Sequence, residues 1–404
     1  MEIRKTIQRL SVNKLPVAMI FLVGTLFTAF LDEELMINKL LVGSMLVSPV
    51  LLLKYSTPAK GELRIWMFLL LFLMIVIVFH LSTFRWTTIA FSCAFIIYFL
   101  IYTRVVNTQK PRIETMALAL KTLLLLYTIV LIIQQFCVIT GLPIFNKCAY
   151  VPSEPFKLNS LMFEPSHTAR VVPIIMYVYI SLREIILGRV TLRKSFQKDR
   201  LAWVAFLYCV ITMLSSTAYL FMMFVFAKFL DKKRSLQFIL LAGGVFIIIN
   251  LLGTNKYLQR TIDSSLATIT LDEGKIFDAD PSAAQRILPS IIGFKSVSLS
   301  SEKDLFGHGI DADGRELRIP EGNFQSSGGA FSLWYNLGFI VQIAYWIMTF
   351  SLCYIKKNKV SIVFWVFCIW IYGGMNNQII WLTMCLLYTL KYYSTRSNIC
   401  KQKV

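Results

Sequence analysis

Long runs of apolar residues constrain this chain more than any other feature of its sequence. Hydrophobic residues make up 56% of the 404 residues, and charged residues only 16%. A water-soluble core cannot bury so much apolar surface, whereas a run of about 20 apolar residues crosses the roughly 30 Å hydrocarbon layer of a bilayer. The composition therefore predicts a polytopic membrane protein and excludes an ordinary soluble enzyme of two or three domains.

The apolar runs that are long enough for single membrane-spanning helices are spread along the chain. They lie near 15–31, 35–53, 63–81, 86–102, 116–140, 168–187, 236–252 and 331–354. Two more stretches, 201–230 and 360–393, are each broken in the middle by small or polar residues. We interpret each as a pair of short helices, because non-helical backbone at membrane depth must be buried in protein or line a wet cavity. The prediction is an all-α protein with about twelve transmembrane helices.

The net charge of +19 is explained by membrane topology. With the N-terminus inside, the predicted inner segments hold most of the Lys and Arg, and the outer segments hold most of the Asp and Glu. This distribution follows the positive-inside rule and predicts cytoplasmic N- and C-termini. Nucleic acid is excluded as a partner, because the basic residues lie in a layer next to the membrane and form no groove with interleaved aromatic residues.

Two outer segments are large enough to carry a site. The predicted organisation is 1–140 for the first five transmembrane helices, 141–167 for a first periplasmic loop, 168–252 for helices six to nine, 253–330 for a large periplasmic loop, and 331–404 for the last three helices and a cytoplasmic tail. A function is expected in the two loops, because binding and catalytic residues concentrate in loops that a rigid scaffold positions.

Ionisable residues crowd the end of the first loop, where it enters a span. Glu164, His167 and Arg170 lie within seven residues of one another, around Pro165 and Ser166. They can supply a base, a proton relay and an anion clamp. The alternative interpretation is an interfacial loop with Ser166 at the start of the helix and an arginine that reaches toward the lipid headgroups. Ionisable groups at membrane depth are usually functional, which favours the first interpretation.

The large loop contains two further candidates. Asp280-Pro281 predicts the start of a short helix that is kinked or ended near Pro289, and Arg286 on this helix can present its guanidinium to a phosphate. The alternative for Arg286 is a solvated surface position. Downstream, Gly307 and Gly309 let the backbone turn tightly around His308, although a single histidine in a turn is more often structural than catalytic.

Two Asp-x-Asp pairs in the large loop resemble metal sites but are discounted. Asp278 and Asp280 form the first pair, and Asp311 and Asp313 form the second. The predicted topology places both on the periplasmic side of the membrane, where nucleotide sugars are absent. The second pair also lacks the further acidic positions of a calcium loop. We therefore predict no metal site and no cofactor.

Several of these features together resemble a known family, the bacterial O-antigen and capsular polysaccharide repeat-unit polymerases. The similarity covers roughly residues 160–345. It consists of Phe163-x-Glu-Pro-Ser166, a hydroxyl-rich break at Ser215-Ser216-Thr217, then Ser282 and Arg286, then Leu305-Phe306-Gly307-His308-Gly309-Ile310, and finally Asn336-Leu337-Gly338-Phe339-Ile340. The earlier helices match the family only in number and character.

The resemblance implies a membrane glycosyltransferase with a GT-C-like fold in the bacterial inner membrane. Such an enzyme transfers the growing glycan from undecaprenyl diphosphate to a new lipid-linked repeat unit at the periplasmic face, without a metal or cofactor. Its partners are the undecaprenyl-diphosphate-linked oligosaccharide, membrane lipid and a protein that regulates chain length.

The implied roles fall on residues of the two loops. Arg286 and Arg170 are expected to stabilise the diphosphate leaving group. Glu164 is the candidate base, with His167 or His308 as alternates, and these catalytic candidates are joined by Ser166, Arg318 and Arg260 as further contacts to diphosphate or glycan.

Two other functions stay open at this point. An O-antigen ligase has a similar plan but is expected to carry a His-Asn pair before its next span, where this chain has Gly322-Asn323-Phe324-Gln325. A flippase or transporter of lipid-linked oligosaccharide would fit Lys39 and Lys121 within predicted spans, but the chain shows no halves related by a repeat.

Overall fold

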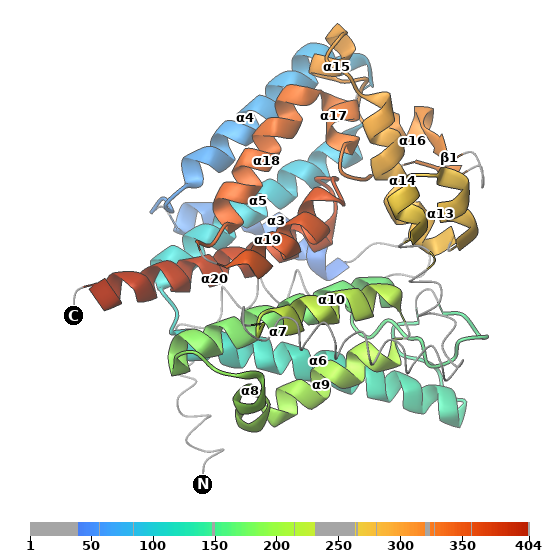
Figure 1. Cartoon of the computed structure of the whole chain (residues 1–404). Coiled ribbons are helices and arrows are strands. Elements are labelled where there is room, and N and C mark those ends of the chain that lie inside the picture. The colour runs from blue at the N-terminus through green and yellow to red at the C-terminus, as the bar shows by residue number, and fades with distance from the viewer. Residues whose placement is uncertain are drawn as a thin grey trace.

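The described part of the chain is mostly helical, as the sequence predicts (Figure 1). The computed structural model describes residues 39–55, 57–83, 85–147, 150–213, 215–230, 263, 266–279, 281–319, 324–326, 328–356 and 358–402. The first helices are α3 (Lys39–Lys54), α4 (Glu62–Phe79), η1 (Leu81–Thr83), α5 (Trp86–Gln109), α6 (Ile113–Thr140), α7 (Pro165–Leu187), α8 (Leu192–Lys198), α9 (Arg200–Thr212) and α10 (Ser216–Ala227). The later elements are α13 (Glu273–Ala279), α14 (Pro281–Ser296), α15 (Glu302–Phe306), α16 (Ala312–Glu316), β1 (Arg318–Ile319), β2 (Phe324–Gln325), α17 (Ser332–Leu337), α18 (Phe339–Cys353), α19 (Lys359–Trp365), the π-helical turn η3 (Val366–Trp370) and α20 (Gln378–Gln402).

Three of the described helices, α4, α5 and α6, are long and apolar enough to cross a membrane. A fourth candidate is formed by α7 and α8 together, if these two helices, which meet at a bend of 94°, are counted as one broken span. Other apolar stretches form helices of 10–17 residues. The predicted spans near 15–31 and 236–252 lie outside the described residues. The described chain therefore has an architecture that suits a membrane, with fewer full-length spans than the apolar runs alone predict.

Both stretches that the sequence analysis interprets as broken are broken. The stretch 201–230 forms α9 and α10, and the stretch 360–393 is interrupted between η3 and α20 by a turn that contains Gly373, whose φ is +60°. The predicted span 331–354 is also divided, at Gly338, into α17 and α18. The last break is not predicted, and its cause is a contact with a distant part of the chain that is described below.

The helix α7 lies at the centre of the bundle. Every residue from Thr168 to Leu182 on this helix is buried. It packs against α6, α10 and α20, and in Figure 1 it lies in the lower helical layer with α20 above it. A helix that is buried on all faces has a fixed position, so the side chains of its first turn are held by the whole bundle.

The described part of the large loop forms a small layer at one end of the bundle (Figure 1). Its own core contains Ile276, Ala284, Leu288, Ile292 and Ile319. The prediction for this helix is a kink or an end near Pro289. The helix α14 does not end there but continues to Ser296, because the core residues on both sides of the proline hold the two halves in place. The strands β1 and β2 pair antiparallel over two residues each.

The helix α15 in this layer begins with a capping box. The Ser301 hydroxyl accepts from the Asp304 backbone N–H, and the Asp304 carboxylate accepts from the Ser301 backbone N–H. Hydrogen bonds from the hydroxyls of Ser298 and Ser301 lower the pKa of Asp304 to about 2. This carboxylate is therefore ionised and engaged in holding the layer together.

Candidate functional site

The helix α7 begins at a Glu-Pro pair, which fixes where its first side chains lie. Pro165 is the first helical residue, and Glu164 occupies the N-cap position with an extended backbone, φ −131° and ψ 153°. Proline is pre-organised for the first turn and keeps the residue before it extended. The Ser166 hydroxyl donates to the Glu164 carboxylate at 2.9 Å. Glu164, and not Ser166, is thus the residue at the start of the helix.

Arg170 is a buried cation, and one of its guanidinium nitrogens makes no hydrogen bond to a described residue. Its side chain is 2% exposed, and its Nε donates to the Ser166 carbonyl at 3.1 Å. Its guanidinium carbon lies 4.1 Å from the centroid of the Tyr372 ring. The nitrogen Nη1 is buried and has no hydrogen-bond partner among the described residues. An unsatisfied charged donor costs free energy in a buried place, so this nitrogen is suited to an anionic ligand.

The helix α14 brings a second arginine to the same place. The charge of Arg286 acts on both Arg170 and His167, and Glu164 also acts on Arg170. The ring of His167 lies 6.2 Å from that of Phe163. The structure therefore gathers Glu164, His167, Arg170 and Arg286, which we call the arginine cluster. Arg170 is buried and Arg286 is partly exposed. Their like charges repel, and an anion between them relieves that repulsion.

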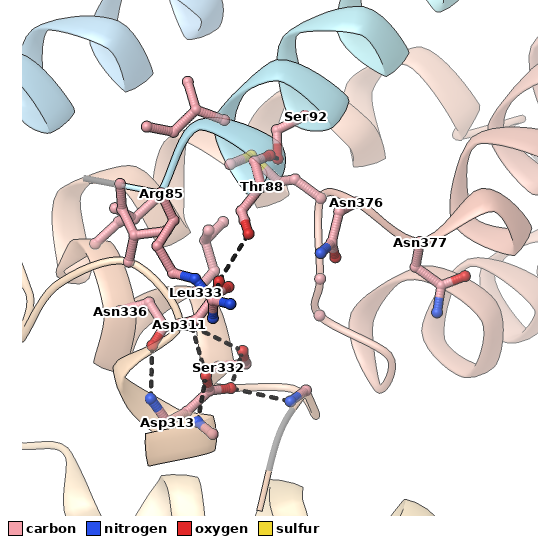
Figure 2. Close-up of a pocket in the computed structure, with 18 of the residues that line it drawn as sticks. Arg85, Thr88, Ser92, Asp311, Asp313, Ser332, Leu333, Asn336, Asn376 and Asn377 are labelled. Atoms are coloured by element: carbon pink, nitrogen blue, oxygen red, sulfur yellow. Dashed lines mark hydrogen bonds and ion pairs between the residues drawn. The ribbon is translucent and has the colours of Figure 1, made fainter. Parts of the chain in front are cut away.

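The structure also contains a cavity of about 630 Å³ (Figure 2). Its polar lining residues are Arg85 before α5, Thr88 and Ser92 of α5, Asp311, Asp313 and Arg315 of the segment before β1, Ser332 and Asn336 of α17, and Tyr372, Asn376 and Asn377 of the turn before α20. Tyr372 also carries the stacked guanidinium of Arg170. The arginine cluster and the cavity therefore share one wall.

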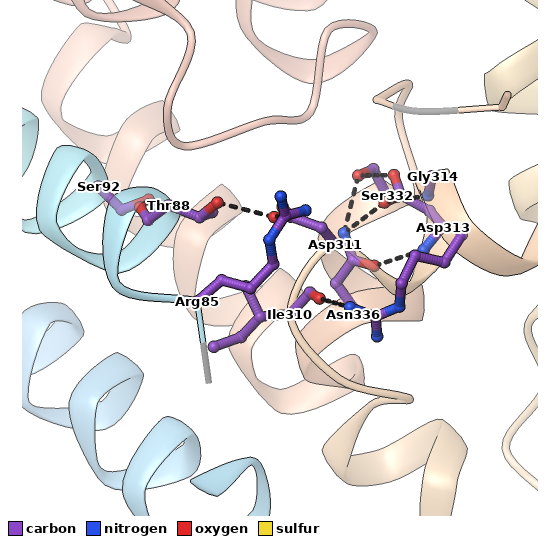
Figure 3. Close-up of polar contacts among 10 residues, drawn as sticks. Arg85, Thr88, Ser92, Ile310, Asp311, Asp313, Gly314, Ser332 and Asn336 are labelled. Carbon is purple, nitrogen blue, oxygen red and sulfur yellow. Dashed lines mark hydrogen bonds and ion pairs between the residues drawn. The ribbon is translucent and has the colours of Figure 1, made fainter. Parts of the chain in front are cut away.

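A buried carboxylate organises one side of the cavity (Figure 3). Asp313 is 4% exposed, and each of its oxygens accepts two hydrogen bonds. The donors are the backbone N–H groups of Gly314 and Gly328, the Ser332 hydroxyl and the Asn336 amide. Because all four donors are neutral and fixed, Asp313 is a structural carboxylate that joins the ends of α16 and α17.

Asp311 is held differently, by Thr88 of α5 and by Arg85, the N-cap residue of that helix. Its Oδ2 accepts from Arg85 Nη1 at 3.0 Å and from the Thr88 hydroxyl at 2.7 Å, across more than 220 residues of sequence. Its backbone is left-handed, with a φ of +54°. A residue other than glycine adopts this conformation at a cost that its surroundings must offset, and such residues are concentrated at functional sites.

The two glycine-containing motifs in the late part of the chain pack directly against each other. A Cβ on Gly307 would lie 2.3 Å from the Asn336 carbonyl oxygen, and one on Gly338 would lie 2.0 Å from the Leu305 carbonyl oxygen. Both glycines have a positive φ. Backbone hydrogen bonds from His308 and Gly309 to residues 335 and 336 complete the pairing. These glycines therefore set the position of α17, which lines the cavity.

The structure does not bring the remaining site candidates to the arginine cluster. The His308 ring stacks on Tyr335 with centroids 4.2 Å apart, and its Nδ1 lies 3.7 Å from a Glu316 carboxylate oxygen. Arg318 is exposed on β1, and Arg260 lies outside the described residues. Among the residues that the structure describes, no contact links His308 or Arg318 to the two arginines.

The two Asp-x-Asp pairs differ in their surroundings, since the described residue of the first pair is exposed and the second pair is hydrogen-bonded. Asp278 is exposed at the end of α13, and Asp280 lies outside the described residues. Both oxygens of Asp313 accept the hydrogen bonds described above, whereas the Asp311 carboxylate accepts them at Oδ2. Within the described ranges no three His, Cys, Asp or Glu side chains are grouped so that they can hold a metal ion.

Arg85, Thr88 and Tyr372 are site residues that the sequence analysis does not single out. Arg85 is a charged residue in the short turn between two predicted spans, and Tyr372 immediately precedes the predicted Gly373-Gly374 break. Their locations, in a turn between spans and next to a break in a span, are the sequence features by which Arg85 and Tyr372 can be recognised as site residues. Their connection to Asp311 and Arg170 depends on contacts between segments that are distant in sequence.

Comparison of the chain with protein-family models, with curated proteins and with solved structures gives no match. What the chain does is therefore inferred from the chemistry of the arginine cluster and of the cavity that shares Tyr372 with it.

Proposed function

We propose that this chain is a membrane glycosyltransferase that polymerises a polysaccharide such as an O antigen or a capsule. It transfers the growing glycan from undecaprenyl diphosphate to a new lipid-linked repeat unit at the periplasmic face of the bacterial inner membrane. In this proposal the chain crosses the membrane about twelve times, has a GT-C-like plan and keeps both termini in the cytoplasm.

The arginine cluster is the observation that carries the proposal. Arg170 is almost fully buried with one nitrogen that lacks a partner among the described residues, and Arg286 adds a second positive charge from another segment. A diphosphate is a leaving group that develops negative charge as its bond to the sugar breaks. Fixed cationic donors at that position stabilise the transition state more than the ground state.

The bond changes follow from this placement. A hydroxyl oxygen of the acceptor repeat unit attacks the anomeric carbon of the growing glycan, and the bond from that carbon to the diphosphate oxygen breaks. The electron pair leaves with the diphosphate, between Arg170 and Arg286. The hydroxyl proton passes to a base, for which Glu164 is the candidate because its carboxylate lies in the same cluster.

The substrates require both a lipid surface and water. The undecaprenyl chain stays in the bilayer, beside apolar helices such as α4, α5 and α6. The arginine cluster lies at the start of α7, where the first predicted periplasmic loop meets the helix. In this proposal a partner protein that regulates chain length acts on the length distribution of the product.

The test is the gel profile of surface polysaccharide from a strain that lacks this protein. Complementation with the wild-type chain is expected to restore a ladder of long chains, and Arg286→Ala is expected to leave lipid core with one repeat unit. Gln285→Ala is the matched control, because Gln285 is the exposed neighbour of Arg286 on α14 and should restore the ladder.

Two results would contradict the proposal. Bare core without any repeat unit in the deletion strain would indicate ligation or export in place of polymerisation. A normal ladder with Arg286→Ala, at protein levels equal to those of Gln285→Ala, would remove Arg286 from the site and with it the proposed stabilisation of the leaving group.

A further inference from the structure

The cavity beside the arginine cluster differs from it in charge. Two arginines and two aspartates line the cavity, so it carries no net formal charge, and Asp311 is paired with Arg85 at 3.0 Å. The arginine cluster, in contrast, has an arginine nitrogen without a partner among the described residues. The two neighbouring sites therefore select different chemical groups, one an anion and the other a neutral polar molecule.

The lining of the cavity suits a polyhydroxylated ring. Hydroxyl and amide side chains such as Thr88, Ser332, Asn336 and Asn376 lie beside apolar ones such as Leu333 and Met375. Figure 2 shows Asn376 and Asn377 on one side of the cavity and Asp311 and Asp313 on the other. A sugar presents hydroxyls around its edge and C–H groups on its faces, so it needs this mixture of polar and apolar surface. The volume of about 630 Å³ falls within the range of sites for small ligands, about 300–1,000 Å³.

Asp311 is the lining residue best placed to recognise hydroxyl groups. Arg85 and Thr88 both donate to its Oδ2, and no described residue donates to its Oδ1. A carboxylate oxygen that is held in place but still has accepting capacity binds hydroxyl donors strongly. The left-handed backbone at Asp311, with a φ of +54°, is a cost that this recognition explains.

We propose that this cavity is a binding site for an uncharged sugar residue, and that Asp311 selects the sugar by accepting hydrogen bonds from its hydroxyls. Arg85 and Thr88 act as positioning residues for the Asp311 carboxylate. Tyr372 stands between this sugar site and the arginine cluster, so a molecule with a diphosphate joined to sugars can occupy both. The identification of the sugar as part of a lipid-linked repeat unit rests on the proposed function, whereas the binding of a neutral sugar in the cavity does not.

The test measures two ligands separately on the purified full-length protein in lipid nanodiscs. The first is a panel of free neutral sugars, D-glucose, D-galactose, D-mannose and N-acetyl-D-glucosamine, whose binding is followed by saturation-transfer NMR. The second is farnesyl diphosphate, whose binding is followed by calorimetry. The variants are Asp311→Asn, Asn376→Trp, which fills the cavity from an exposed position, and Arg286→Ala.

We expect at least one sugar of the panel to bind the wild type. Its affinity should fall at least about tenfold in Asp311→Asn and in Asn376→Trp, because the first loses a charged acceptor and the second loses the space. Farnesyl diphosphate should bind both variants as it binds the wild type. The control Glu302→Gln makes the same carboxylate-to-amide change at an exposed position on α15 and should leave both affinities unchanged.

The two proposals fail in different ways. If no sugar of the panel binds the wild type, or if one binds Asp311→Asn and Asn376→Trp as tightly as the wild type, the sugar site is overturned. If a sugar binds as expected but farnesyl diphosphate does not bind, or binds Arg286→Ala as well as the wild type, the sugar site stands and the proposed function is the part that fails.

Discussion

Arg170 is positioned by neutral neighbours and a ring, with no carboxylate in ion-pair contact among the described residues. Its Nε donates to a backbone carbonyl, its guanidinium plane lies over Tyr372, and Nη1 has no described partner. Stacking on an aromatic face contributes about 2 kcal/mol when the cation is desolvated. Stacking on the ring orients the guanidinium while its N–H groups stay available as donors. A site for a diphosphate requires donors that are oriented and available in this way.

The stack predicts that charge alone is not sufficient at position 170. Arg170→Lys keeps the charge but loses the planar fork, so the rate of polymerisation by purified protein should fall at least about tenfold, or ~1.4 kcal/mol. Tyr372→Phe keeps the ring and should retain most of the activity, whereas Tyr372→Ala should lose as much as Arg170→Lys. Equal rates for Arg170→Lys and the wild type would show that the fork has no role.

At the scale of elements, glycines determine where helices are interrupted and where two segments of backbone come into close contact. Gly338 separates α17 from α18, and Gly373 interrupts the chain before α20 at a point where a Cβ would lie 1.8 Å from the Gly329 carbonyl oxygen. Both have a positive φ. The breaks are therefore close approaches of backbone to backbone, and they bring α17 and the turn at Tyr372 to the cavity.

A substitution at Gly338 tests this role. In Gly338→Ala the new Cβ would lie 2.0 Å from the Leu305 carbonyl oxygen, on a backbone with a φ of +89°. The free energy of unfolding in detergent should fall by about 2 kcal/mol or more. The control is Gly43→Ala, because Gly43 lies within α3 with nothing within 4 Å of its Cβ position. There the change should be neutral or stabilising by about 0.5–1 kcal/mol. Similar stability losses in the two variants would contradict the packing argument.

The limits of prediction from sequence follow from the range of the contacts. The start of α14 at Pro281 is correctly predicted, because proline at a first helical position is a local signal. The start of α7 is not, since the predicted span begins at 168 and the helix begins at Pro165. The breaks in 201–230 and 360–393 are also visible locally. The division at Gly338 and the contact of Arg85 with Asp311 are not, because each depends on a partner far away in the sequence, 226 residues in the case of Arg85.

At the scale of the whole molecule, the contacts sort into two ends of the bundle. At one end, His80 contacts the Phe306 carbonyl at 2.6 Å and Arg85 contacts Asp311. At the other end, Glu62 accepts from Arg104, and the Tyr393 hydroxyl donates to the Pro111 carbonyl. The residues in contact at the first end lie in segments that are predicted to be periplasmic, or next to a turn that is predicted to be periplasmic. The residues in contact at the second end lie in segments that are predicted to be cytoplasmic. The alternation of α4, α5, α6 and α7 between the ends agrees with this assignment (Figure 1).

The sidedness of the two ends is the last prediction. Cysteines are introduced separately at Lys303, exposed on α15, and at Lys60, exposed before α4, in a chain whose Cys93, Cys148 and Cys400 are replaced by serine, because the other cysteines are buried. A maleimide that does not cross the inner membrane should label Lys303→Cys in intact cells, and Lys60→Cys only after that membrane is permeabilised. The reason is the excess of Lys and Arg near the second end, which the positive-inside rule keeps in the cytoplasm. The reverse labelling pattern would place Arg170 and Arg286 on the cytoplasmic side, away from exported repeat units, and would contradict both the topology and the proposed polymerisation.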